Sequence, residues 1–125
     1  MSGISDSDVI SALRRQMTIA AARQAASAGN LANIDTPNYK AVEVSFSETL
    51  EAQVAATHPG HLGGGGTPGV RTEEIQDAAA RRDGNNVVLD QELLKMGRAA
   101  GDFSAAQTAL AAKFRLVRYA INEGR

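Results

Sequence analysis

The chain of 125 residues contains no cysteine and no tryptophan, and aromatic residues make up only 4% of it. Without cysteine there is no disulfide, and thiol catalysis and cysteine-based metal sites are excluded. Alanine supplies much of the 43% hydrophobic content. Because alanine buries little surface, we do not expect a large self-sufficient core. This length corresponds to one ordinary domain at most.

The chain also lacks a strong charge of either sign and a long apolar run. Its 13 basic and 14 acidic residues leave a net charge of −1, which gives no electrostatic basis for binding nucleic acid or an anionic membrane. No run approaches the roughly 18 apolar residues of a membrane span. The acidic start, MSGISDSDVI, has no basic region followed by an apolar one, so we expect no cleaved signal peptide.

Residues 5 to about 33 have the pattern of a first helix. Ser5, Asp6 and Ser7 are candidate N-caps, and Asp8 suits the positive end of the helix dipole. The apolar stripe of this helix is thin because several of its positions are alanine. Its members are Ile10, Leu13, Met17, Ala20 or Ala21, Gln24, Ala28 and Leu31.

The stretch ANIDTPNY, residues 32 to 39, ends this helix. Pro37 lacks an N–H and disfavours the helical conformation in the residue before it. Proline followed by Asn38 is typical of a type II turn, in which asparagine tolerates a positive φ. We expect Asn33 to satisfy backbone groups at the helix end and Tyr39 to pack on the helix just completed. The turn motif comprises Ala32, Asn33, Thr36, Pro37, Asn38 and Tyr39.

Residues 40–85 form a middle segment of mixed character. Val42, Val44 and Phe46 alternate with polar residues, which predicts a short extended piece. The run SFSE that follows fits a capping box and predicts a short helix from about 46 to 57.

Residues 58–69, HPGHLGGGGTPG, predict a flexible loop that continues to about residue 82. His58 and His61 lie in this loop, where no rigid framework supplies the three or four ligands that a metal needs. The glycine run has neither the preceding strand nor the GK[ST] of a phosphate loop. We therefore predict no catalytic, cofactor or metal site and no small-molecule ligand.

The strongest periodic signal lies in residues 86–125. Asn85 or Asn86 is the expected N-cap of a long helix. Alanines 99, 106 and 120 permit close approach of another helix. The apolar positions alternate in spacings of four and three, as in a coiled-coil seam. This predicted assembly seam comprises Leu89, Leu93, Met96, Ala100, Phe103, Gln107, Leu110, Phe114, Val117 and Ile121.

Two motifs carry a resemblance to a known family. NLANIDTPNYKA resembles the A-N-x-x-T-P-G-Y signature of bacterial flagellar rod, hook and related axial proteins, and DGNNVVLDQELLKM is similar to the D-G-N-N-V-D-L-[DE]-x-E-[ML] pattern of the proximal-rod members. The resemblance covers about residues 8–55 and 83–122. Asn38 replaces the glycine of the signature, which the positive-φ argument tolerates. Val88 replaces the usual aspartate, so the helix needs another N-cap, for which Asn86 is expected.

The resemblance implies an all-α fold in which long N- and C-terminal helices form an antiparallel coiled-coil hairpin around an irregular, partly flexible middle. The corresponding parts are residues 1–39, 40–85 and 86–125. It further implies a structural subunit of the proximal rod, located in the flagellar basal body and exported by the flagellar type III apparatus without signal cleavage. The implied partners are copies of the chain, other rod subunits, the rod-base adaptor FliE and, as a further candidate, the MS ring.

An alternative from a different class is a soluble helical adaptor or secretion chaperone that dimerises through the same heptads. It predicts a stable helical dimer, whereas the rod interpretation predicts a mostly disordered monomer that orders on assembly. A small enzyme would need a pocket with converging polar groups, which the sequence does not offer.

Overall fold

The structure, a computed structural model, describes residues 5–46 and 70–123. The predicted helix at 46–57, apart from Phe46, and the predicted glycine loop with His58 and His61 lie outside the described residues. The elements are α1 (Asp6–Ala32), β1 (Val42–Phe46), β2 (Val70–Glu74) and α3 (Leu89–Glu123).

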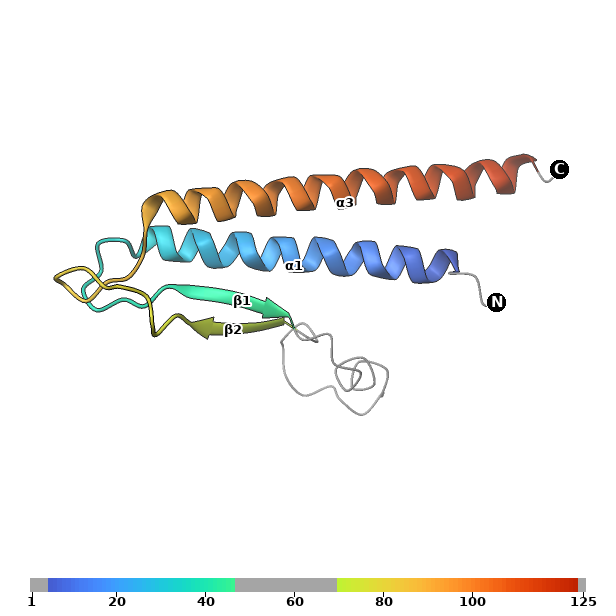
Figure 1. Ribbon diagram of the computed structural model, residues 1–125. Helices are drawn as coiled ribbons and strands as arrows, with labels where there is room; N and C mark the ends of the chain where they lie inside the picture. The colour runs from blue at the N-terminus through green and yellow to red at the C-terminus, as the bar shows by residue number, and fades with distance from the viewer. Residues whose placement is uncertain (1–4, 47–69, 124–125) are drawn as a thin grey trace.

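Two long antiparallel helices dominate the molecule. α1 and α3 lie side by side along most of their length, and β1 and β2 lie along the side of α1 that faces away from α3 (Figure 1). The predicted fold of two packed terminal helices is confirmed. The small strand pair is an addition to the all-α expectation.

The start of α1 follows from its first residues. Ser5 is the N-cap: its hydroxyl accepts the Asp8 N–H at 3.2 Å, and its own N–H donates to the Asp8 carboxylate at 3.1 Å. The Ser5 hydroxyl also donates to this carboxylate at 2.6 Å, and these hydrogen bonds lower the pKa of Asp8. This reciprocal capping box is stronger than the single cap that was predicted.

The buried face of α1 differs in part from its predicted stripe. Ala20 is buried as expected, and Ile10, Leu13, Met17 and Leu31 are half-buried. Ala28 is exposed, so its predicted place in the stripe is wrong. The polar residues Ser27 and Asn30 are buried instead. This is because α1 packs against both α3 and β1 and not against a single apolar partner.

The start of α3 corrects the predicted N-cap. Asn86 does not cap the helix, because its side chain is engaged elsewhere: Oδ1 accepts the Ala41 N–H at 2.5 Å and Nδ2 donates to the Ile75 carbonyl at 2.6 Å. The helix begins at Leu89 with Asp90 and Glu92 in its first turn. These two acidic residues complement the helix dipole at this end.

The two strands pair antiparallel, with Val42 opposite Glu74 and Phe46 opposite Val70. The predicted extended piece at 42–46 is therefore confirmed. The expectation of a loop that continues to residue 82 is wrong at β2. Its sequence, VRTEE, has four exposed residues of five, so the apolar pattern carried no strand signal.

The core is small, as the alanine-rich composition predicted. Its fully buried hydrophobic residues are Ile19, Ala20, Ala41, Val44, Val87, Ala99 and Ala106. Several of these are alanines, which bring α1 and α3 close together but bury little apolar surface. Polar contacts at one end of the helix pair supplement this core.

Candidate functional site

The turn motif adopts the conformation that its sequence predicted. Asn38 has φ 62° and is the only residue other than glycine with a positive φ in the described parts of the chain. The Tyr39 N–H donates to the Thr36 carbonyl at 3.3 Å, which closes the turn around Pro37. Asn33 Nδ2 donates to the Gly29 carbonyl at 2.9 Å, so it satisfies the helix end as expected.

Asn85 holds the turn onto the segment that leads into α3. It is fully buried, and its Nδ2 lies 2.9–3.0 Å from three carbonyl oxygens, those of residues 33, 34 and 36. Its Oδ1 accepts the Val87 N–H at 2.8 Å. One side chain thus ties three carbonyls of the turn that follows α1 to the entry of α3.

Asn30 joins the end of α1 to β1 in the same way. It is fully buried, accepts the Val42 N–H at 2.8 Å and donates to the Val42 carbonyl at 2.9 Å, as a neighbouring strand would. The Tyr39 hydroxyl donates to it at 3.3 Å. Asn30 was not among the predicted site residues; its place as the first residue of the NLANIDTPNYKA motif was the available signal.

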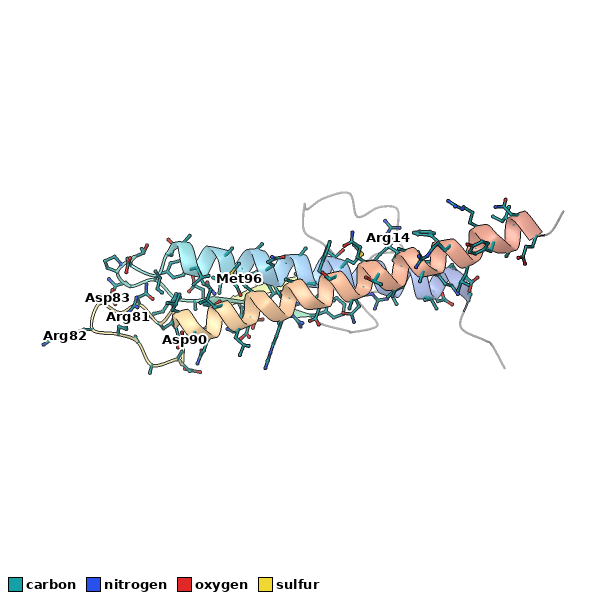
Figure 2. The ribbon with its side chains drawn as sticks, turned by 90° about the horizontal axis from the view of Figure 1, so that it is seen from above. Arg14, Arg81, Arg82, Asp83, Asp90 and Met96 are labelled. Atoms are coloured by element: carbon teal, nitrogen blue, oxygen red, sulfur yellow. The ribbon has the colours of Figure 1, made fainter. Side chains whose placement is uncertain are left out.

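We call Asn30, Asn85 and Asn86 the asparagine junction. Arg81, Arg82 and Asp83 lie at this end of the molecule, beyond the end of α1 and the start of α3 (Figure 2). The junction connects α1, the turn, both strands and the start of α3 through side-chain amides. Their buried donors and acceptors are paired with backbone groups, which makes such a polar network stabilising.

Gly84 fits closely against the turn within this region. It has φ +84°, and the N–H of Asn38 donates to the neighbouring Asp83 carbonyl at 2.8 Å. A Cβ atom at position 84 would lie 2.3 Å from Asn38 Oδ1 and 3.3 Å from its Cα. Both the conformation and the contact therefore require glycine.

The predicted seam of α3 is divided between two sides of the helix. The buried residues Glu92, Ala99 and Ala106 each precede a seam residue by one position. Four seam residues are half-buried, namely Met96, Phe103, Leu110 and Val117. The other six are exposed, namely Leu89, Leu93, Ala100, Gln107, Phe114 and Ile121.

α3 extends past the beginning of α1. Lys113 Nζ lies 2.6 Å from the carboxylate of Asp6, the first residue of α1, and α3 continues to Glu123. At about 1.5 Å per residue, this extension is roughly 15 Å long (Figure 1). We call residues 114–123 the open end. Val117 is half-buried there, but four large hydrophobic side chains are exposed: Phe114 by 53%, Leu116 by 63%, Tyr119 by 62% and Ile121 by 69%.

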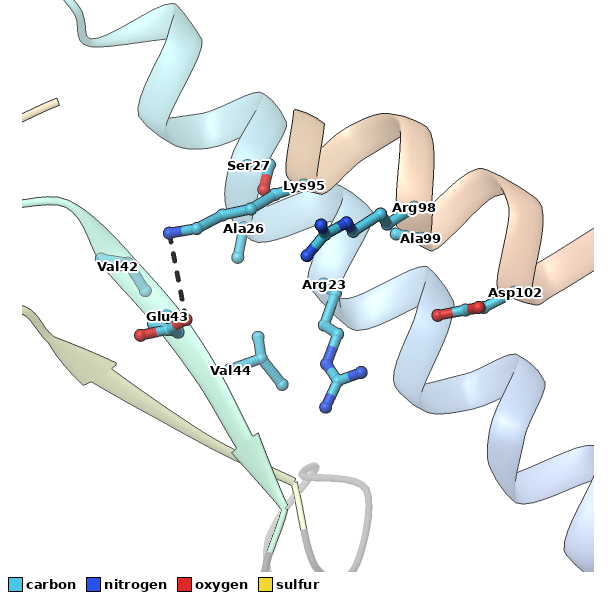
Figure 3. A pocket seen from close by; sticks show the side chains of 10 residues that line it. All are labelled: Arg23, Ala26, Ser27, Val42, Glu43, Val44, Lys95, Arg98, Ala99 and Asp102. Carbon is cyan, nitrogen blue, oxygen red and sulfur yellow. Dashed lines mark ion pairs between the residues drawn. The ribbon is translucent and has the colours of Figure 1, made fainter. Parts of the chain in front are cut away.

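A cleft of about 200 Å³ lies where α1, α3 and β1 meet (Figure 3). Lys95 pairs across it with Glu43 at 3.9 Å and, on its own helix, with the buried Glu92 at 3.4 Å. Arg23 and Arg98 contribute further positive charge to its lining. No group of three or more metal-ligating side chains occurs among the residues that the structure describes. Nor is any helix there long and apolar enough to cross a membrane.

No family model matches the chain. It is 27% identical over 125 residues to the flagellar basal body rod protein FlgB of Bacillus subtilis (strain 168), and the match covers 95% of this chain and 97% of that protein. The predicted resemblance to rod proteins of the FlgB type is confirmed by this similarity. It suggests a structural subunit of the flagellar rod.

Proposed function

We propose that this chain, as a relative of FlgB-type rod proteins, is a subunit of the proximal rod that assembles helically through its terminal helices. In this role it transmits torque, lines the export channel and is required for motility. Its neighbours are copies of itself, other rod subunits and the adaptor FliE at the rod base, with the MS ring as a further candidate. It reaches the rod through the flagellar type III export apparatus, without a cleaved signal peptide.

The open end of α3 is the observation that carries this proposal. Phe114 and Ile121, two of its exposed apolar side chains, continue the predicted seam towards the C-terminal end of α3. Each large apolar side chain that becomes buried contributes about 1.5–3 kcal/mol. A subunit with a small core of its own gains that stability only when neighbouring molecules cover the open end.

The test places one charge at two positions of α3. Phe114→Asp puts a carboxylate into the proposed contact, where burial costs several kcal/mol unless the charge is paired. Thr108→Asp is the matched control, because Thr108 is exposed and lies off the seam. Both proteins are expected to be exported, since an unfolded substrate has no seam contact. Only Phe114→Asp should be missing from purified basal bodies and leave cells non-motile.

Thr108 is used as the control position in place of Arg98, which the heptad alone would suggest. Arg98 occupies an outer heptad position, but it lines the cleft at β1. A substitution of Arg98 would therefore also change the cleft. Equal incorporation of Phe114→Asp and Thr108→Asp into basal bodies would remove the seam from the proposed assembly interface.

The exposed half of the seam is also compatible with a dimeric adaptor or secretion chaperone. That function predicts a stable helical dimer of the purified chain at micromolar concentration. The rod function predicts a monomer that gains much of its order on assembly. Circular dichroism combined with light scattering distinguishes the two.

A further inference from the structure

Two arginines line the cleft between the helices and β1. Figure 3 shows Arg23 on α1 and Arg98 on α3, both with side chains extending over the cleft, and Asp102 one turn further along. Among the described residues, neither guanidinium lies within 4.0 Å of a carboxylate oxygen, whereas Lys95 is paired twice. We call this site the arginine cleft.

The chemistry of the arginine cleft favours a carboxylate ligand. Its lining includes the apolar residues Ala26, Val44 and Ala99, and apolar surroundings lower the local dielectric and strengthen charge pairing. A guanidinium presents a planar fork of donors that matches a carboxylate in bidentate fashion. The cleft is therefore suited to an acidic side chain carried by a polypeptide.

The same strand pair presents such side chains on its outer strand. Glu73 and Glu74 of β2 and the nearby Asp77 line a shallow groove and are exposed. Glu73 is paired in register with Glu43 of β1, so like charges face each other within one chain. β1 separates β2 from the helices (Figure 1), which prevents these carboxylates from entering the arginine cleft of their own chain.

We propose that the arginine cleft of one copy receives the acidic segment Glu73–Asp77 of a neighbouring copy. The proposal rests on the proposed function, because it names one contact between assembling subunits. Two different, complementary surfaces on one chain produce a head-to-tail contact that does not close into a dimer. This geometry is the one that a helical rod requires.

Crosslinking tests the contact directly, because the chain has no cysteine of its own. Two differently tagged full-length copies, Arg98→Cys and Glu74→Cys, are produced together in cells that lack the native protein. Oxidised basal bodies should contain a disulfide-linked product carrying both tags. Replacing Arg98→Cys by Thr108→Cys should lower its yield about tenfold, because the effective concentration of the two thiols falls.

Charge exchange provides the second arm. Glu74→Arg is expected to reduce incorporation into basal bodies about tenfold, and Arg98→Glu in the same chain should restore it, because every copy then carries both reversed surfaces. Restoration distinguishes a charge contact from a general loss of folding.

Three outcomes would overturn the inference. If both tagged proteins are present in basal bodies but the mixed crosslink does not exceed the control, this contact is wrong while the rod function stands. If Arg98→Glu prevents incorporation but Glu74→Arg does not, the ligand is not a second copy. If the unaltered protein is absent from basal bodies, the proposed function fails, and the contact fails with it.

Discussion

The two ends of the helix pair solve the same packing problem in different ways. At the asparagine junction, three buried amides pair with backbone groups of the turn, the strands and the entry to α3. At the open end, α3 runs on alone with exposed Phe114, Leu116, Tyr119 and Ile121. The junction end is completed within one chain, whereas no other helix or strand of the described residues runs alongside the last turns of α3. Local stability should therefore be high at the junction and low at the open end, which native hydrogen exchange measures residue by residue.

The largest effect is expected for Asn85→Ala, which removes the junction's central side chain. The buried Val87 N–H loses its acceptor. The carbonyls of residues 33, 34 and 36 lose one donor each and keep the Thr36 N–H, the Arg81 guanidinium and the Tyr39 N–H. Leaving the Val87 N–H unpaired costs about 1–3 kcal/mol, and each hydrogen bond lost by a carbonyl that keeps another donor costs about 0.5–1.5 kcal/mol. Amide protection in residues 33–42 and 84–87 should fall by a factor of about 100 or more.

The control for this experiment is Asn122→Ala. Asn122 is exposed at the open end, so its removal should leave protection at the junction unchanged. Undiminished protection in Asn85→Ala would mean that the junction does not hold this end closed.

A smaller loss is expected for Gly84→Ala. The left-handed conformation at φ +84° and the contact with Asn38 together cost about 1–3 kcal/mol. Gly101→Ala in α3 is the matched control, because a Cβ there meets no atom within 4 Å. That substitution should stabilise the helix by roughly 0.5–1 kcal/mol. Hydrogen exchange should therefore show lower amide protection in Gly84→Ala and higher protection in Gly101→Ala. A change in the same direction in both variants would contradict the account of Gly84.

Asn38 tests the turn with a milder change. Asn38→Gly should be neutral or slightly stabilising, because glycine adopts φ 62° without strain. Asn38→Val should cost about 1–2 kcal/mol, because a β-branched side chain is unfavourable there, and should impair swimming. Equal motility and equal amide protection at the junction in the two variants would show that the positive φ at residue 38 is not required.

The features that the sequence predicted depend on near neighbours. The Ser5 cap, the helix stop at Pro37 and the positive φ of Asn38 each follow from a few consecutive residues. The alternating valines of β1 and the long heptad of α3 are also local patterns. For this reason the two helices and the turn could be recognised without the structure.

The missed features depend on residues far apart in the chain. Asn30 pairs with Val42, and Asn86 pairs with Ala41 and Ile75, and no local pattern specifies these partners. Asn86 next to the helix start fits a cap equally well, so only its distant contacts exclude that role. The heptad identified an apolar stripe on α3 but not which part of it α1 covers, since that depends on the rotation of one helix against the other.

The smallest effect on the free chain is expected at the open end. Ile121 is 69% exposed, so Ile121→Ser removes little buried surface and should change local stability by no more than about 0.5 kcal/mol. Amide protection in residues 114–123 should be low in both proteins, because no second helix of the described residues runs alongside the last turns of α3. In the rod, the same substitution removes an apolar side chain from the proposed contact. Incorporation into basal bodies should then fall although the free chain is unchanged. If amide protection and incorporation both fall, Ile121 stabilises the monomer. If neither falls, the proposed contact surface does not include Ile121.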